Sequence, residues 1–95
     1  MRSIKESFEE KAEIFSLLSN PIRICIAFSL FMKGPSTVSE IQGCANVPQS
    51  SVSQHLAKLK SGGIVKAKRH GNEMHYELVN EDVKALLKLI FAEHL

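Results

Sequence analysis

The stretch PQSSVSQHLAKLKSGGIVKAKRHGNEMHYEL, residues 48–78, decides the fold of this chain of 95 residues. Its first part has the apolar spacing of a short amphipathic helix, because Val52, Leu56 and Leu59 stand at positions i, i+4 and i+7. A pair of glycines ends that helix. Two segments with strand character follow, joined by a turn that contains glycine. The stretch therefore predicts a helix and then a β-hairpin.

The hairpin is predicted from residues 64–69 and 73–78, with a tight turn at residues 70–72. Glycine supplies the positive φ that such a turn needs. Because side chains alternate between the two faces of a strand, Met74 and every second residue after it should point inward. The hairpin would then rest its apolar face on the preceding helices.

The remaining helices are predicted from apolar periodicity, caps and breakers. Asn20 is a cap followed by Pro21 at the first helical position. Thr37, with Glu40 three residues later, fits a capping box. Two short helices joined by a turn then form a helix-turn-helix. The predicted helices are residues 4–18, 21–33, 38–44, 49–61 and 81–94.

We therefore expect one domain over residues 1–95, mainly α with a small β-hairpin wing. This is a winged helix-turn-helix, with the helix-turn-helix at about 38–61 and the wing at about 64–78. The last helix shows more apolar surface than one small core needs, which indicates a subunit contact. This surplus lies on the helix predicted at 81–94.

The charges are distributed unevenly along the chain. Residues 41–72 contain five lysines and arginines and no acid, whereas the formal net charge is zero before them and −3 after them. The asymmetry is more informative than the total of +2. A cationic surface without acids suits a polyanion such as double-stranded DNA.

The predicted helix at 49–61 exposes short polar side chains where a solvated face usually carries Glu and Lys. Serine is only a middling helix former, so a serine-rich exposed face needs a reason. Glutamine and serine can bond to base edges, and lysine can reach guanine or a phosphate. The alternative is a plain solvated face. The expected DNA contacts of this helix are Gln49, Ser50, Ser51, Ser53, Gln54, His55 and Lys58.

The basic residues of the hairpin directly follow that helix. Charges on a strand often serve only to discourage edge pairing. Their place beside the polar helix favours contact with the DNA backbone, which positions a protein without reading sequence. The expected phosphate contacts are Lys60, Lys66, Lys68, Arg69 and His70.

Three segments carry a family resemblance: LLSNPIRICIAFSL (17–30), SSVSQHLAKLKSGGIV (50–65) and KRHGNEMHYEL (68–78). Over about residues 16–95 the chain resembles the ArsR/SmtB family of winged-helix bacterial repressors. It is most similar to the metal-independent, virulence-repressor-like subgroup, whose recognition helix also begins Pro-Gln-Ser.

The resemblance implies a homodimer paired through the first and last helices. It also implies that two recognition helices meet an inverted repeat, with half-sites about one helical turn or a small multiple apart. Repression would follow from blocked promoter access, although the same fold also serves activators. The residues that we assign to the dimer interface are Phe8, Phe15, Leu87, Ile90 and Phe91.

The family's metal sites are not reproduced in this chain. Thr37 and Ser39 stand where metal-sensing relatives carry two cysteines. The last helix offers Asp82, Glu93 and His94, but not in the spacing of the family's second metal site. These three residues are more typical of a cap and of terminal charges. We therefore expect no metal site and no cofactor, and an effector that is either absent or of unknown identity.

Cys25 and Cys44 lack the spacing of a metal or redox motif. We expect two small, buried thiols in a reducing compartment. The alternative is a redox-responsive regulator in which these two cysteines form a disulfide.

Other classes of function are weakly supported. An enzyme is not expected, because there is no glycine-rich phosphate loop and no nucleophile beside a base. A winged-helix protein-interaction module remains the second alternative, and weak salt dependence of binding would distinguish it. The longest apolar stretch, residues 22–32, is too short and interrupted to span a bilayer, and no signal-peptide core precedes it. The expected location is cytoplasmic, without a membrane partner.

Overall fold

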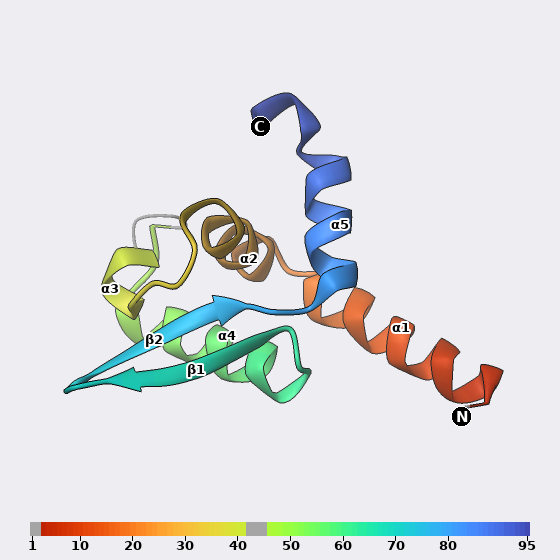
Figure 1. Cartoon of the computed structure of the whole chain (residues 1–95), viewed down its shortest axis with the longest axis horizontal. Coiled ribbons are helices and arrows are strands. Elements are labelled where there is room, and N and C mark those ends of the chain that lie inside the picture. Colours follow the sequence, from red (N-terminus) through yellow and green to blue (C-terminus); the bar gives the residue numbers. More distant parts are fainter. Residues whose placement is uncertain (1–2, 42–45) are drawn as a thin grey trace.

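The computed structural model describes residues 3–41 and 46–95. Figure 1 shows five α-helices and a two-stranded hairpin within this part of the chain. Their mostly helical content confirms the predicted fold class. The elements are α1 (Ile4–Leu18), α2 (Pro21–Lys33), α3 (Val38–Ile41), α4 (Gln49–Ser61), β1 (Val65–His70), β2 (Glu73–Leu78), α5 (Glu81–Ile90) and the 3-10 helix η2 (Ala92–His94).

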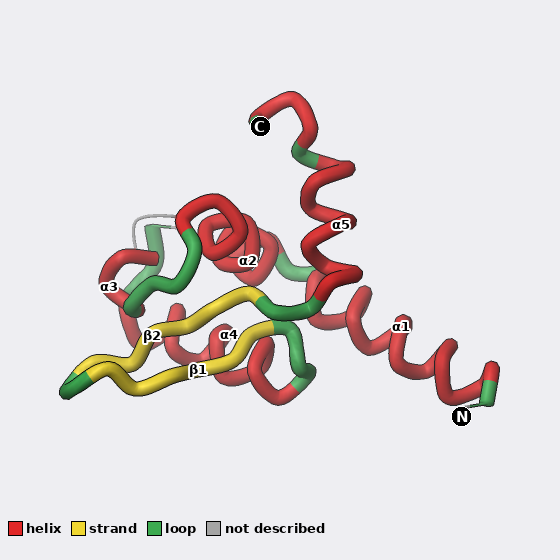
Figure 2. The backbone as a smooth tube through the Cα atoms, in the orientation of Figure 1, coloured by secondary structure: helices red, strands yellow, loops and turns green. Residues whose placement is uncertain are grey.

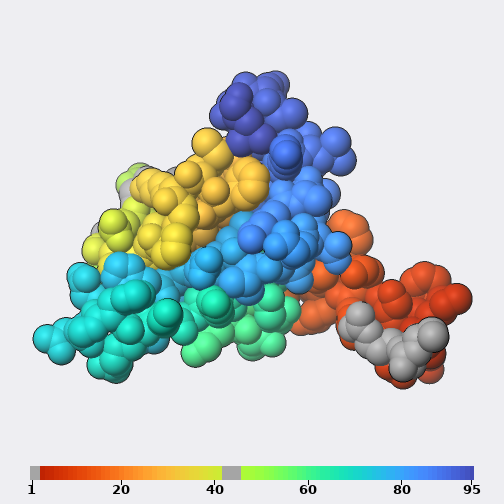
Figure 3. Space-filling model, in the orientation of Figure 1, coloured from red at the N-terminus to blue at the C-terminus, as the bar shows by residue number. Residues whose placement is uncertain are grey.

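The helices α2, α3 and α4 form the body, and the antiparallel hairpin of β1 and β2 lies against it (Figure 2). The helix α1 extends away from this body, and α5 rises beside the end of α1 (Figure 1). In the space-filling view α1 projects as an arm that the rest of the protomer leaves largely uncovered (Figure 3). This shape separates a body of three helices and a hairpin from two helices with free surface.

The predicted caps are present. Asn20 Oδ1 accepts bonds from the backbone N–H groups of Ile22 and Arg23, at 2.9 and 3.2 Å. Thr37 N–H donates to Glu40 Oε1 at 2.8 Å, while Glu40 N–H donates to Thr37 Oγ1 at 3.4 Å. This reciprocal pair is the capping box. The bond from Thr37 N–H is the main reason that the pKa of Glu40 lies below its ordinary value.

The core confirms the buried seam of α4, because Val52, Leu56 and Leu59 are at most 1% exposed. The central helix α2 adds Ile26 and Leu30 to the same cluster. Burying aliphatic side chains from several elements in one cluster is the main force that holds α4 in place. The orientation of its polar face therefore follows from its apolar seam.

Three predicted boundaries were wrong. The strand β1 starts one residue later than predicted, because Ile64 is buried and its carbonyl instead accepts bonds from Val79 and Asn80 N–H. The strand β1 also ends one residue later than predicted, at His70, so the turn is shorter, with Gly71 at a φ of 63°. The last α-helix ends at Ile90. The end predicted for the third helix, at residue 44, lies outside the described residues.

The last helix ends early because its final aromatic residue turns into the core. Phe91 has a φ of −112° and a ψ of 25°, outside helical geometry. Its ring lies 4.3 Å from that of Phe28, centroid to centroid. This contact holds the chain in a different direction, and η2 follows.

No single helix in the described part is long and apolar enough to cross a membrane. Only α1 and α2 taken together reach that length, and they are bent by 98° with respect to each other.

Candidate nucleic-acid interface

The outward face of α4 is built from small and amide side chains. Ser50, Ser53, Gln54 and Ala57 are all exposed, and their spacing places them on one side of the helix. The buried seam lies on the opposite side. Short side chains allow the helix backbone to come close to the floor of a major groove, where the Gln54 amide can pair with a base edge.

Ala57 belongs to this face, although the sequence reasoning did not select it. Its side chain is exposed between the polar positions and adds no bulk. A methyl group in this place suits contact with the methyl group of thymine. The signal in the sequence was its position four residues after Ser53, on the face opposite the seam.

The predicted DNA contacts of α4 divide into two groups. Gln49, Ser50, Ser53, Gln54 and Lys58 are exposed, as that role requires. The remaining two, Ser51 and His55, are half-buried on the flank of the helix.

His55 is half-buried and lies against α2. Its Nδ1 lies 3.3 Å from Nη1 of Arg23, so the neutral ring accepts a bond from the guanidinium. Partial burial, and then the positive charges of Arg23 and Lys58, hold the pKa of His55 below its ordinary value of 6.5. The contact gives His55 a packing role between two helices, and its contact with DNA stays a prediction.

The lowered pKa predicts how stability depends on pH. The folded state resists protonation of His55, so the unfolded state binds the proton first as the pH falls below 6.5. We expect this contribution to stability to be complete above that pH and to be lost as the pH falls through the lowered pKa.

The measurement is the free energy of unfolding in urea, from about pH 7.5 to about pH 5. A His55→Asn variant keeps an acceptor near the place of Nδ1 but does not titrate. It should show a shallower decline than the parent, and identical declines would contradict the assignment.

Residues 41–72 contain no acid, but they do not make up the whole wing, and the second strand adds acidic residues. Lys66 and Lys68 share one face of β1 with His70. Strand pairing brings Glu77 opposite Lys66, with Nζ 3.8 Å from Oε1. This outer face is therefore partly neutralised, because β2 supplies acids that the sequence window excluded. Both lysines remain exposed.

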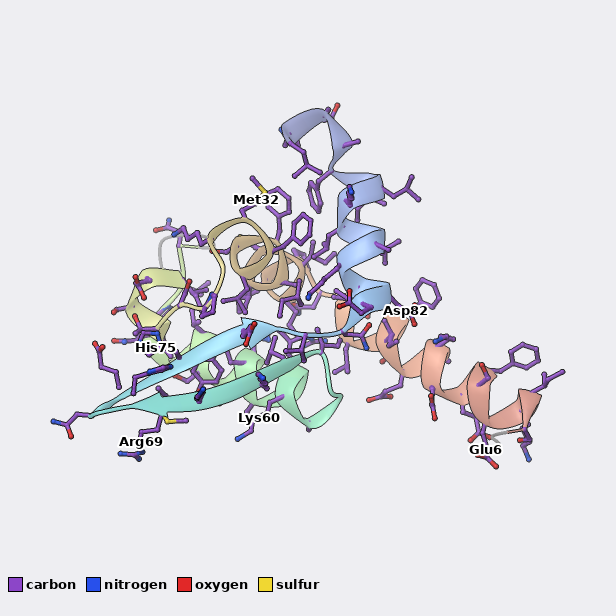
Figure 4. The ribbon with its side chains drawn as sticks, in the orientation of Figure 1. Glu6, Met32, Lys60, Arg69, His75 and Asp82 are labelled. Carbon is purple, nitrogen blue, oxygen red and sulfur yellow. The ribbon has the colours of Figure 1, made fainter. Side chains whose placement is uncertain are left out.

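The tip of the wing carries Arg69 on the other face of the hairpin, opposite Met74. Arg69 is exposed, and Figure 4 shows its side chain below the hairpin, near the tip. Lys60 extends from α4 on that side as well (Figure 4). His70 packs edge-on against His75, with 4.8 Å between ring centroids. Among the expected phosphate contacts, Lys60, Lys68 and Arg69 form no ion pair with an acid in the described part of the chain.

The exposed apolar residues gather on α1 and α5. Phe8 and Phe15 are 69% and 63% exposed, and Leu89 and Ile90 are 75% and 52% exposed. Large apolar side chains in such numbers on neighbouring helices mark an interaction surface.

Two of the residues assigned to the dimer interface contact the protomer's own core, one completely buried and the other in part. Leu87 is 1% exposed and belongs to the protomer's own core, so the assignment to a partner contact was wrong. Phe91 is half-buried against Phe28. Periodicity alone did not separate the two sides of α5. The surplus of apolar surface predicted for the last helix is present, at Leu89.

The residues considered for sensing are engaged in other interactions. Asp82 accepts a bond from Lys11 Nζ at 2.6 Å, which links α5 to α1. Glu93 and His94 lie on η2, beyond the other end of α5. Among the described residues, no three histidines, cysteines or carboxylates lie close enough together to hold a metal ion.

Cys25 is half-buried on α2 and is disulfide-bonded, so the expectation of a free thiol was wrong at this position. Cys44 lies outside the described residues. The redox-responsive alternative therefore stays a prediction.

A model of the bacterial regulatory proteins of the arsR family matches residues 20–67, from the cap of α2 into β1. An uncharacterized HTH-type transcriptional regulator of Methanocaldococcus jannaschii is 38% identical over 85 residues, which are 90% of this chain and 96% of that protein. The chain belongs to the arsR family of bacterial regulatory proteins.

Solved structures in this family share the fold. The crystal structure of the transcriptional repressor PagR of Bacillus anthracis has a TM-score of 0.83 and 32% identity, covering 90% of this chain and 98% of PagR. The solution structure of a homodimeric winged helix-turn-helix DNA-binding domain from Mycobacterium bovis, a possible ArsR-family regulator, has a TM-score of 0.78 and 30% identity. It covers 98% of this chain and 90% of that chain.

Membership confirms the family resemblance and the winged helix-turn-helix fold. This ArsR-family chain is a DNA-binding transcriptional regulator and not an enzyme. The individual contacts with DNA and the metal-independent subgroup remain predictions.

Proposed function

We propose that this ArsR-family chain is a homodimeric repressor that binds an inverted repeat, with α4 reading bases in the major groove. The exposed face of α4 carries the proposal, since Ser50, Ser53, Gln54 and Ala57 combine hydrogen-bonding groups with little bulk. No acid occurs in α4 or β1 to repel phosphates. This combination is what direct readout of base edges requires.

A homodimer is supported by the free apolar surface of α1 and α5. Phe8, Phe15, Leu89 and Ile90 would be costly to leave in water, and a second copy of these helices covers them. The relative from Mycobacterium bovis is a homodimer. Two copies place two α4 helices in successive major grooves, which explains the preference for an inverted repeat.

Repression is supported by the relatives. PagR is named a transcriptional repressor and is 34% identical over 84 residues, covering 88% of this chain and 84% of PagR. A dimer seated on an operator hinders access to the promoter without a further domain. The proposal places the regulator in the cytoplasm, where bacterial DNA lies.

No metal or small-molecule effector is part of the proposal. Thr37 and Ser39, which stand in the cysteine positions of metal-sensing relatives, contact each other at the start of α3. Their side-chain oxygens lie 3.3 Å apart, and Thr37 also bonds to Glu40. Asp82 is paired with Lys11.

The wing completes the interface by holding the DNA backbone. Arg69 at the tip and Lys68 on the outer face are exposed and are the main candidates for phosphate contact. Lys66 contributes less to the field, because Glu77 lies beside it. Contacts of this kind raise the affinity for every duplex and make binding weaker as salt rises.

The test begins with duplexes selected by the purified protein from a random library. Gln54→Ala should cost about 1–3 kcal/mol on the selected duplex and relax the preference at one base position. Arg69→Ala serves as the matched variant and should weaken selected and scrambled duplexes alike, with a flatter salt slope. If Gln54→Ala weakened all duplexes equally, α4 would not be the reading element.

A further inference from the structure

We infer that Arg23 is a positioning residue that fixes the direction of the recognition helix α4 relative to the dimer helix α1, and thereby sets the half-site spacing. The inference rests on the proposed function. Arg23 Nε donates to the carbonyl oxygen of Leu17 at 2.6 Å, and Nη1 lies 3.3 Å from His55 Nδ1. One half-buried guanidinium thus joins the last turn of α1 to the middle of α4.

A second contact joins the same two helices. A Cβ atom at Gly62 would overlap with Cδ1 of Leu17, so the end of α4 is seated directly on that leucine. Gly62 follows His55 by seven residues, which is about two helical turns or roughly 10 Å along the axis. Leu17 therefore fixes α4 at two separated points, one through Arg23 and one by direct packing. Two such points define the direction of a helix.

The direction of α4 relative to α1 matters because α1 carries part of the proposed dimer surface. Phe8 and Phe15 lie on α1, and Leu17 is in its last turn. Any tilt of α4 at Leu17 would change the distance between the two recognition helices of the dimer. An inverted repeat with one fixed spacing is read well only if that distance is fixed.

The chemistry of the bridge requires arginine. The planar guanidinium presents donors in several directions, so one side chain can reach a carbonyl and an imidazole at the same time. A lysine ammonium on a flexible stem cannot hold both partners in a fixed geometry. Because Arg23 donates, His55 must be neutral, with its proton on Nε2. The charged groups that act on His55 are Arg23 on α2 and Lys58 on α4.

The experiment measures the spacing preference of the dimer. Inverted repeats built from the selected half-site are prepared with the preferred spacing and with one or two base pairs added or removed. The parent should bind the preferred spacing at least about tenfold more tightly than its neighbours, since misplaced half-sites lose base contacts in one groove. Arg23→Ala should reduce this ratio to about threefold or less while retaining its salt slope.

The matched control is Lys33→Ala, which also removes a positive charge from α2 but does not touch α4. Its Nζ donates to the Glu40 carbonyl, and its spacing ratio should equal that of the parent. His55→Ala cuts only the arm to α4 and leaves the bond to Leu17, so it should relax the spacing as well. If Arg23→Ala fails to fold, as judged by circular dichroism and thermal melting, the spacing ratio of His55→Ala tests the inference instead.

A folded Arg23→Ala or His55→Ala dimer that keeps the parent's spacing ratio would overturn the inference. The failure of the proposed function looks different, because the parent itself would then prefer no inverted repeat over a scrambled duplex. Arg23→Lys separates charge from geometry. This variant keeps the charge and should still show the relaxed spacing preference. If it kept the parent's full spacing ratio, the two-armed contact of Arg23 would not be the cause of that ratio.

Discussion

Replacing Phe8 and Phe15 together with glutamate is expected to turn the dimer into a folded monomer. Both rings are more than half exposed in the protomer, so the substitution removes nothing from its core. In the dimer, by contrast, each protomer loses two aromatic anchors, and charges take their place. Aromatic anchors contribute about 2 kcal/mol or more each, so the loss of four rings should weaken the dimer by roughly a millionfold.

The oligomeric state is measured by sedimentation equilibrium, and operator binding by titration. The monomer should bind a single half-site and lose the avidity of the paired sites, which is about a hundredfold or more. The control replaces both phenylalanines with leucine, which keeps an apolar face and should keep the dimer. If the glutamate variant remained dimeric, α1 would not form the interface.

Leu56→Ala is expected to destabilise the protein by about 2–5 kcal/mol, a large share of the stability of a small domain. Leu56 is fully buried in the middle of α4, so truncation leaves a cavity between this helix and the rest of the core. The recognition helix would lose packing energy, and its position on the core would no longer be fixed.

Urea unfolding at equal protein concentration measures this effect, because the stability of a dimer depends on concentration. Lys60→Ala on the same helix is the matched control. Its side chain is exposed, and its effect should stay within about 0.5 kcal/mol. A loss at Leu56 no larger than that of the control would contradict the position assigned to α4.

Most of the fold could be predicted because its signals are local. The bounds of α1 and α4 follow from apolar spacing and from helix breakers, and the capping box of Thr37 and Glu40 starts α3 as expected. The end of α5 could not be predicted in this way. It depends on the contact between Phe91 and Phe28, which are far apart in the sequence.

The exposure of a site residue could be predicted where it depends on one helix face. It could not be predicted where two elements meet. The outward face of α4 follows from the periodicity of its seam, which also determines that Gln54 is exposed. The position of His55 depends on Arg23 from another helix, and the charge of Lys66 depends on Glu77 from the paired strand. Leu87 was misassigned because both sides of α5 are apolar.

The most direct test of the account compares the binding of the parent dimer to a selected duplex and to its scrambled counterpart. The titration is repeated at rising salt. The account predicts that the selected duplex binds at least about a thousandfold more tightly at physiological salt. Affinity for both duplexes should fall steeply as salt rises, because several phosphates are contacted. Equal affinity for the two duplexes, or binding that does not respond to salt, would contradict the assignment of α4 and the wing as a sequence-reading DNA interface.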